Sequence, residues 1–181
     1  MNILDKDISM ILYSKESIDK RVKEIGVGLS VGFLDKNPVL ICILRGAVVF
    51  LSDLIRYMTI PLEIDFMSIS SYGSSTVSSG VVQIRKDIDI DITHRHVIVV
   101  EDIVDSGLTL KYILEFLGKH NPASITSCAL LNKPSAHKVP IKIDHVGYEI
   151  ENDFVVGYGL DFADKYRNLP YIGILKEEIY K

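Results

Sequence analysis

The sequence lacks the features that would direct a chain to a membrane, an export route or a nucleic acid. No apolar run approaches the ~18 residues of a membrane span. Residues 1–7 carry early acids where a secretory signal has its apolar core. The net charge of −4 argues against a globally basic surface for nucleic acid. We therefore expect a cytoplasmic protein with no membrane or nucleic-acid partner.

Cysteine is scarce, and several common motifs are absent. Cys42 and Cys128 each lie in an apolar run that predicts a buried strand, so we expect two small core residues rather than a disulfide or a nucleophile. The chain has no Walker A sequence, no G-x-S-x-G elbow and no G-x-G-x-x-G, which argues against a generic dinucleotide binder. The acidic stretch at 87–91 lacks the glycine and glutamate of a calcium loop.

The apolar pattern that is present predicts alternating helices and strands. Apolar residues recur at helical spacing over 18–33 and 46–58. Short apolar segments predict strands at 38–44, 62–69, 81–86, 97–100, 124–131, 142–150, 154–156 and 171–175. This order favours an α/β fold with a central, mostly parallel sheet and helices on both faces. Since 181 residues suit one domain and no linker or repeat interrupts them, we expect a single unit.

Residues 97–110 form the most informative segment. Four apolar residues run directly into Glu101 and Asp102, Asp105 then opens a Ser-Gly-x-Thr turn, and helical spacing resumes at Leu110. This pattern predicts a strand, a tight loop and a helix N-terminus whose N–H groups suit a phosphate. The paired acids indicate a ribose, because sugar hydroxyls donate hydrogen bonds to carboxylates. The expected phosphate cradle consists of Asp105, Ser106, Gly107, Leu108 and Thr109.

This segment closely resembles the 5-phosphoribosyl-1-pyrophosphate signature of type I phosphoribosyltransferases. The resemblance extends over 41–174 and is greatest for the bacterial hypoxanthine(-guanine) members. It rests on the signature and on residues 44–47, 70–73, 131–134, 146–149 and 154–167. It implies the type I phosphoribosyltransferase fold, as one domain over 1–181. A small hood, built by the N-terminal segment and roughly 150–181, would cover the carboxyl end of the sheet.

The resemblance also implies roles for individual residues. Glu101 and Asp102 would hold the ribose hydroxyls, and residues 105–109 the 5′-phosphate. Lys133 would read the 6-oxo group of a purine and Phe154 would stack on the ring, with the backbone of Val155 and Asp161 at the base edge. The pyrophosphate would be bound by Leu44, Arg45, Gly46 and Arg167, with a cis peptide bond between Leu44 and Arg45.

Two further implications concern a metal and a lid. Asp161 would help to hold Mg²⁺, the expected cofactor, and Glu101 and Asp102 complete the expected set of metal-site acids. Ser71 and Tyr72 would belong to a lid within the polar loop at 70–80. Some members of the family have lysine where this chain has Arg45, but the contact there is expected to be largely through backbone.

The implied reaction transfers the phosphoribosyl group to N9 of hypoxanthine, and of guanine, giving IMP or GMP and pyrophosphate in purine salvage. Asp105 is the expected catalytic residue, exchanging a proton at purine N7. The implied assembly is a homo-oligomer, a dimer or a tetramer. Two alternatives stay open: a xanthine-preferring phosphoribosyltransferase, and a non-catalytic nucleotide-binding regulator on the same fold.

Overall fold

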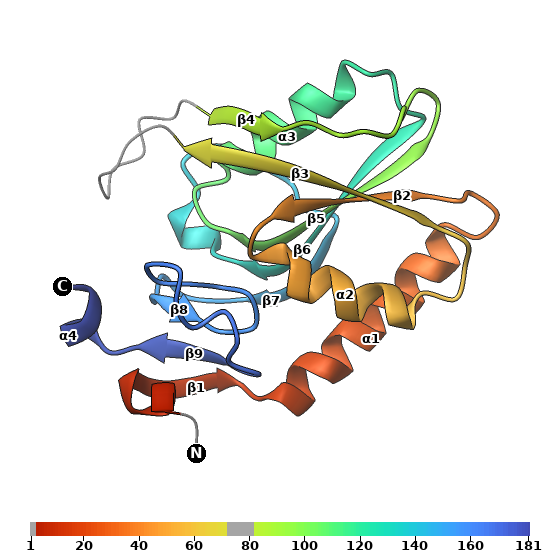
Figure 1. Cartoon of the computed structure of the whole chain (residues 1–181). Helices are drawn as coiled ribbons and strands as arrows, with labels where there is room; N and C mark the ends of the chain where they lie inside the picture. Colours follow the sequence, from red (N-terminus) through yellow and green to blue (C-terminus); the bar gives the residue numbers. More distant parts are fainter. Residues whose placement is uncertain (1–2, 72–81) are drawn as a thin grey trace.

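The computed structural model describes residues 3–71 and 82–181, which form two sheets. Tyr72 and most of the expected lid lie outside the described residues, and Ser71 is the last residue of its strand. The large sheet has the order β4-β3-β2-β5-β6-β7 (Figure 1). Its strands are β2 (Val39–Leu44), β3 (Glu63–Ser71), β4 (Val82–Lys86), β5 (His96–Val104), β6 (Ser124–Asn132) and β7 (His145–Glu149).

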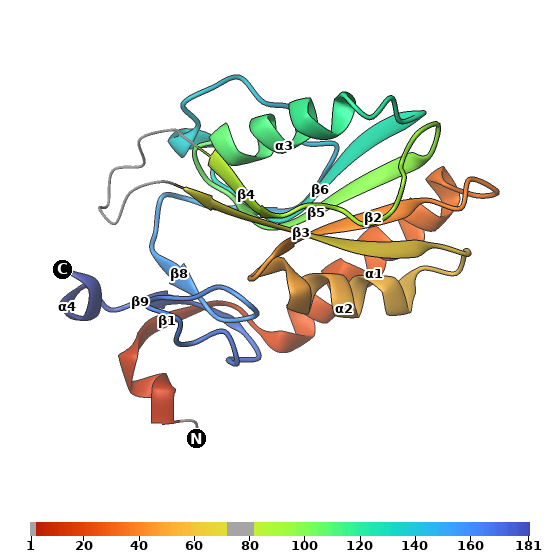
Figure 2. The ribbon, with the colours of Figure 1, turned by 45° about the horizontal axis from the view of Figure 1, so that its top comes forward.

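All neighbouring strands of this sheet are parallel except β4, which pairs antiparallel with β3 at one edge. Two helices cover one face, α1 (Lys15–Gly32) and α2 (Ala47–Tyr57), and α3 (Leu108–Gly118) covers the other (Figure 2). The predicted α/β class is therefore confirmed. Among residues 3–71 and 82–181, no helix combines the length and the apolar character that a membrane crossing requires.

The side chains of β2 alternate between these two layers, because successive residues of a strand point to opposite faces. Leu40 and Cys42 pack with the core under α1 and α2, whereas Ile41 and Ile43 pack with the core under α3. Cys42 and Cys128 are buried and unpaired, as predicted. Burial is the main cause that raises the pKa of each thiol to about 12, so neither cysteine suits a nucleophile.

The apolar stripe predicted for the first helix is the buried side of α1. Ile18, Val22 and Leu29 are almost wholly buried there. The helix begins after Ser14, whose side-chain oxygen accepts a hydrogen bond from the backbone N–H of Ser17 at 3.3 Å. The helical spacing and the cap together explain why the helix starts at Lys15.

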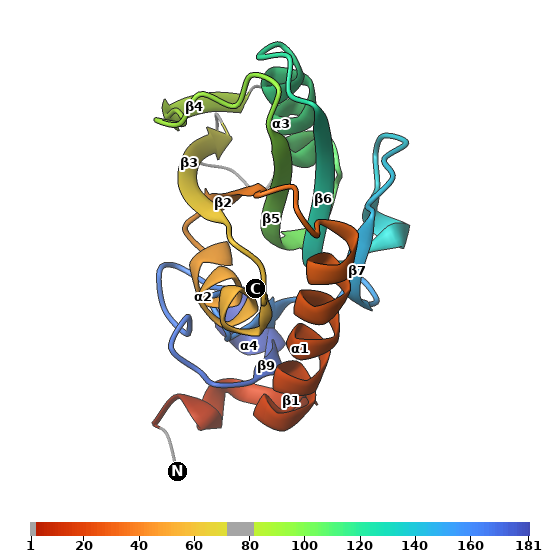
Figure 3. The same ribbon diagram turned by 90° about the vertical axis from the view of Figure 1, so that its right-hand side faces the viewer.

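The second sheet joins the two ends of the chain. Strands β1 (Ile8–Tyr13) and β8 (Val155–Val156) both pair antiparallel with β9 (Ile172–Leu175), in the order β1-β9-β8. In Figure 3 this sheet lies below the large sheet, beside the start of α1. A hydrogen bond from the Tyr166 hydroxyl to the Asp7 carboxylate (3.0 Å) also connects the N-terminal and C-terminal segments. Short helices complete the described chain: η1 (Ile3–Asp7), η2 (Pro134–Ala136) and α4 (Glu177–Tyr180).

The strand order places a crevice between β2 and β5. After β2 the chain passes through α2 to β3 on one side, and after β5 it passes through α3 to β6 on the other. In open α/β sheets, ligands bind at such a reversal, outside the carboxyl ends of the strands. The loops after Leu44 and Val104 leave the sheet at this point.

Asp65 anchors the turn that leads from β4 to β5. This buried carboxylate accepts hydrogen bonds from the backbone N–H groups of Phe66 (2.7 Å), Asp89 (2.7 Å) and Ile90 (2.9 Å). Burial alone would raise the pKa of Asp65, but the three donors outweigh burial and keep the pKa below its ordinary value.

Asp65→Asn is therefore expected to lower the free energy of unfolding by ~2 kcal/mol at pH 7, because bonds to an ionised acceptor are the stronger ones. The pKa is lower in the folded state, so the contribution is complete above the unfolded-state value of about 3.9 and disappears as pH falls through the folded value. Urea unfolding at pH 7 and at about pH 3, below the unfolded-state pKa, measures this contribution. Asp153→Asn removes an exposed acid outside this turn and is the control. Equal stability of Asp65→Asn and the unmodified chain at pH 7 would contradict the assignment.

Candidate functional site

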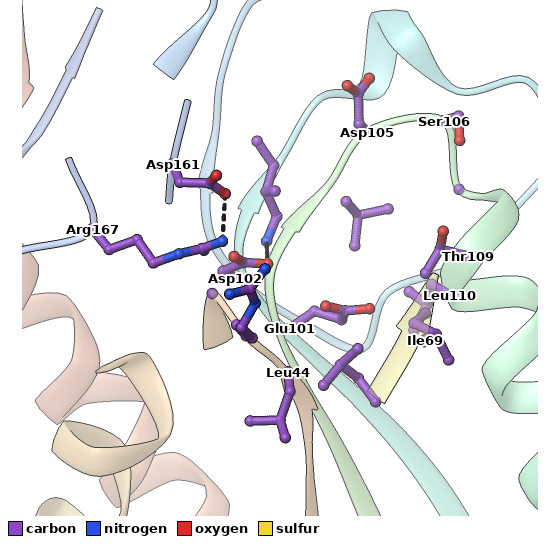
Figure 4. A pocket seen from close by; sticks show the side chains of 16 residues that line it. Leu44, Ile69, Glu101, Asp102, Asp105, Ser106, Thr109, Leu110, Asp161 and Arg167 are labelled. Carbon is purple, nitrogen blue, oxygen red and sulfur yellow. Dashed lines mark hydrogen bonds and ion pairs between the residues drawn. The ribbon is translucent and has the colours of Figure 1, made fainter. Parts of the chain in front are cut away.

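A cavity of about 330 Å³ lies at the carboxyl end of the large sheet (Figure 4). It is bounded by the β2–α2 loop, the end of β5, the loop into α3 and the segment that follows β8. The sequence-predicted residues that line it are Leu44, Arg45, Gly46, Glu101, Asp102, Asp105, Ser106, Gly107, Thr109, Asp161 and Arg167. Segments far apart in the chain therefore meet at one edge of the sheet.

Glu101 and Asp102 lie on the floor of the cavity. Burial raises the pKa of Glu101 well above its ordinary value, and the neighbouring charge of Asp102 adds to this. Burial also raises the pKa of the half-buried Asp102 to about 6, although the N–H of Ile103 (2.9 Å) and the charge of Arg167 oppose the rise. These two acids are adjacent and have little contact with solvent. A hydrogen-bond donor or a cation that reaches them would therefore stabilise their ionised form.

Gly46 leaves the space that Asp102 occupies. A Cβ atom at Gly46 would lie 1.6 Å from Oδ2 of Asp102. Gly159 is equally constrained from the other side, since its Cβ would lie 2.2 Å from the carbonyl oxygen of Gly46 and its φ is +100°. The segment after β8 thus touches the β2–α2 loop backbone to backbone. The Leu44–Arg45 peptide bond in this loop is cis, in the form that the resemblance implies.

The loop from β5 into α3 has the geometry of an anion cradle. Gly107 caps α3 with a left-handed φ of +77° and packs closely against Ile141. The Ser106 hydroxyl accepts a long hydrogen bond from the N–H of Leu108 at 3.4 Å. The Ser106 carbonyl accepts another from the N–H of Lys138 at 2.9 Å. The N-terminal turn of α3, with Thr109, therefore faces the cavity from a fixed loop.

Lys133 and Asp105 lie next to each other because of the register between β5 and β6. Val104 pairs with Asn132 across these parallel strands, so the next residues of both strands leave the sheet side by side. Nζ of Lys133 lies 4.0 Å from Oδ2 of Asp105. The Lys133 side chain is only 8% exposed, whereas that of Asp105 is 59% exposed. A buried cation and an accessible acid thus stand at one edge of the site.

Arg167 faces the acids from the opposite side. Its guanidinium donates to the carbonyl oxygen of Gly159 at 2.8 Å and lies 2.7 Å from Oδ1 of Asp161 (Figure 4). Arg45 extends from the β2–α2 loop and pairs with Asp164 at 3.0 Å. The two arginines therefore come from loops that follow strands of different sheets, and both line the same cavity.

The other residues predicted to contact a purine lie outside this cavity. Lys133, Phe154 and Val155 are not among its lining residues. Val155 is buried in β8. The Phe154 ring stacks on Tyr180 with centroids 4.7 Å apart and meets Phe162 edge-on at 5.6 Å. The structure thus brings the phosphoribose and pyrophosphate candidates together, and places the aromatic candidate in a separate cluster.

Several lining residues were not predicted from the sequence. Ile69, Ile103 and Val104 add apolar walls to the cavity, and Asp164 contacts both predicted arginines. Ile103 lies within the recognised signature, where its alternation with Asp102 could have indicated an apolar wall. Asp164 had no such signal, because its place depends on a left-handed turn with φ of +61° that no glycine marks.

Fold and site together define an α/β protein whose sheet edge suits a phosphorylated sugar. A model of the phosphoribosyl transferase domain matches residues 12–163. The hypoxanthine-guanine phosphoribosyltransferase of Bacillus subtilis is 49% identical over 179 residues, covering 99% of each chain. A crystal structure of a hypoxanthine phosphoribosyltransferase from Staphylococcus aureus has a TM-score of 0.96 at 42% identity, covering 99% of this chain and 98% of that one. The chain belongs to the phosphoribosyl transferase domain family, which confirms the resemblance.

The raised pKa of Asp102 has a testable consequence for stability. An acid whose pKa is higher in the folded state destabilises the fold once it is ionised, so its cost grows as pH rises from about 4 to above 6. Asp102→Asn should therefore stabilise the ligand-free and metal-free protein, by ~1–3 kcal/mol at pH 8 and roughly half as much at pH 5. Urea unfolding at both pH values tests this, with Asp105→Asn as an exposed control. The same gain at pH 5 and pH 8 would count against it.

Proposed function

We propose that this chain transfers the 5-phosphoribosyl group of 5-phosphoribosyl-1-pyrophosphate to N9 of hypoxanthine or guanine and releases pyrophosphate, as a transferase of purine salvage. One observation carries the proposal. A carboxylate pair, an anion cradle and two arginines share a single cavity at the switch point of the sheet. Two relatives at 48–49% identity, both hypoxanthine-guanine phosphoribosyltransferases, support the same substrates.

The donor is proposed to lie across the cavity from the cradle to the arginines. Residues 105–109 would bind its 5′-phosphate through N–H and hydroxyl groups. Glu101 and Asp102 would accept hydrogen bonds from the ribose hydroxyls in charge-assisted form. The pyrophosphate would lie at the loop of Leu44, Arg45 and Gly46, facing Arg167, since guanidinium groups match phosphate oxygens.

The purine is proposed to lie between Asp105 and the cluster that contains Phe154. The 6-oxo oxygen and N7 are neighbours on one edge of a 6-oxopurine, and in the free base N7 can carry the proton. Lys133 and Asp105 are adjacent in the same way, so the ammonium would donate to the oxo group while the carboxylate exchanges the proton at N7. Phe154 would stack on the ring, and the backbone of Val155 and Asp161 would contact its remaining polar edge.

The residues of the chain fit a role for Mg²⁺. Four carboxylates and only two guanidinium groups line the cavity, although the donor itself is highly anionic. Glu101, Asp102 and Asp161 are hard oxygen ligands, and few protein carboxylates suffice because Mg²⁺ retains water and takes substrate oxygens. When bound, Mg²⁺ would neutralise charge on the leaving pyrophosphate.

The chemistry assigned to the side chains is mainly positioning and charge placement. Departure of pyrophosphate leaves positive charge on the ribose ring, beside Glu101 and Asp102, and negative charge near Arg45 and Arg167. Asp105 would take the N7 proton and so raise the nucleophilicity of N9. Each charge that develops thus meets a group of opposite sign.

The same proposal extends to the whole chain. We regard residues 1–181 as one unit in which the small sheet acts as a hood, supported by the contact of Gly159 with Gly46. A homo-oligomer, dimer or tetramer, is supported by the exposed apolar side chains of Val27, Val31 and Leu34 at the end of α1. A cytoplasmic location is supported by two unpaired, buried cysteines.

Lys133 is expected to decide which purines react. Its ammonium can only donate, so the amino group of adenine would face it with no acceptor between them. A site built on such a bond rejects the mismatched analogue by ~10⁴-fold or more. Assays of the donor with hypoxanthine, guanine, xanthine and adenine should therefore show turnover of hypoxanthine and guanine and negligible turnover of adenine. Xanthine as the best substrate would favour the alternative specificity, and no turnover of any base would favour a non-catalytic binder.

Lys133→Met should lose activity with 6-oxopurines and narrow the gap to adenine. The matched control is Lys138→Met, an exposed lysine five residues further along the same loop. If Lys133→Met still prefers 6-oxopurines to adenine as strongly as the unmodified chain does, this lysine does not recognise the base.

Asp105→Asn is expected to reduce turnover by roughly 10²–10⁴-fold, the range of general acid–base catalysis. Donor binding should be largely retained, because the amide preserves the shape of the loop. Steady-state kinetics and donor titration distinguish the two effects. Turnover near that of the unmodified enzyme would exclude Asp105 from proton transfer.

A further inference from the structure

Asp164 lies between the two arginines of the site. It belongs to the loop that follows β8, and its Oδ1 atom is 3.0 Å from Nη2 of Arg45 and 3.4 Å from Nη2 of Arg167. One oxygen atom therefore faces both guanidinium groups. Both arginines belong to the pyrophosphate site proposed above.

The two arginines depend on Asp164 to different degrees. Arg167 is 28% exposed and is held at shorter distances by the carbonyl of Gly159 (2.8 Å) and by Asp161 (2.7 Å). Arg45 is 70% exposed, and within the described part of the chain Asp164 is the one ion-pair partner of its side chain. Loss of the Asp164 charge would leave Arg167 anchored and release Arg45.

The backbone at Asp164 allows its charge to be removed without a change of turn. Its φ of +61° is left-handed, a region in which asparagine is as well tolerated as aspartate. Its N–H donates to Oδ2 of Asp161 at 2.9 Å, and this bond does not involve the Asp164 side chain. Asp164→Asn therefore isolates the charge.

We propose that Asp164 is a built-in competitor of pyrophosphate, an internal anion that occupies Arg45 and the outer side of Arg167 until the donor displaces it. This inference rests on the function proposed above. Carboxylate and pyrophosphate oxygens are both acceptors only, so they compete for the same N–H donors. The Asp164 side chain is 64% exposed, and exposed ion pairs are weak, so the donor can displace it readily.

The test measures binding of inorganic pyrophosphate, with Mg²⁺, to the full-length protein by calorimetry. Asp164→Asn is expected to bind pyrophosphate roughly two- to five-fold more tightly than the unmodified chain, the range that a weak exposed pair allows. The gain should shrink as the salt concentration rises from about 0.05 M to about 0.5 M, because salt screens exposed charges. The donor KM should fall by a similar factor while kcat does not rise.

Two further variants separate the possible outcomes. Asp153→Asn, which removes an exposed acid that precedes β8 and does not line the cavity, should leave pyrophosphate binding unchanged. Arg167→Gln should weaken it strongly. Equal or weaker binding by Asp164→Asn, with Arg167→Gln still impaired, would overturn the competitor and leave the pyrophosphate site intact. Pyrophosphate binding that is absent, or indifferent to Arg167→Gln, would instead overturn the proposed site, and the competitor with it.

Discussion

The adjacent acids at the end of β5 are the constraint around which the site is organised. Glu101 and Asp102 lie where a buried strand meets the cavity, and burial disfavours the ionised form of both. Such a pair lowers stability in the free protein, because charge without solvent must find partners elsewhere. The neighbouring elements supply only part of this compensation, through the Ile103 N–H and the charge of Arg167. The rest of this destabilisation is not offset within the free protein. On the proposed function, a ligand would offset it, so the lost stability would reappear as binding affinity.

The loop that follows β8 contributes further ion pairs beside the two buried acids. The ion pairs form a chain of alternating charges across the boundary between the two sheets, in the order Asp161, Arg167, Asp164 and Arg45. Without a ligand both Arg45 and Arg167 have a carboxylate partner. On the proposed function, the phosphate oxygens of the donor would take the place of these carboxylates at little net cost. These ion pairs therefore position the two arginines in the free protein, and the exposed pair of Arg45 with Asp164 can exchange partners.

The sequence predicted the parts of this arrangement that depend on local pattern. The run of apolar residues, acids and small residues at 97–110 predicted the order of strand, loop and helix, because each has its own residue preferences. The strand end was predicted four residues too early, since β5 continues through the two acids to Val104. The contact of Lys133 with Asp105 was not predicted, because it depends on the register between β5 and β6. Strand β1 was not predicted, since Ser9, Met10 and Ile11 are all exposed and show no alternation. The partners of Asp164 could not be predicted either, because they depend on left-handed turns at non-glycine residues.

A steric condition joins the two sheets into one site. Gly46 provides room for the Asp102 carboxylate, and Gly159 lies against the backbone of Gly46, so these groups share a volume that admits no further side chain. A Cβ at Gly46 would displace the Asp102 carboxylate, and a Cβ at Gly159 would move the loop that follows β8 away from the β2–α2 loop. Arg167 would move with this loop, because its guanidinium donates a hydrogen bond to the Gly159 carbonyl. The electrostatic balance around Glu101 and Asp102 therefore depends on two residues that carry no charge. The close approach of these two loops is what brings charges from distant parts of the chain to one cavity.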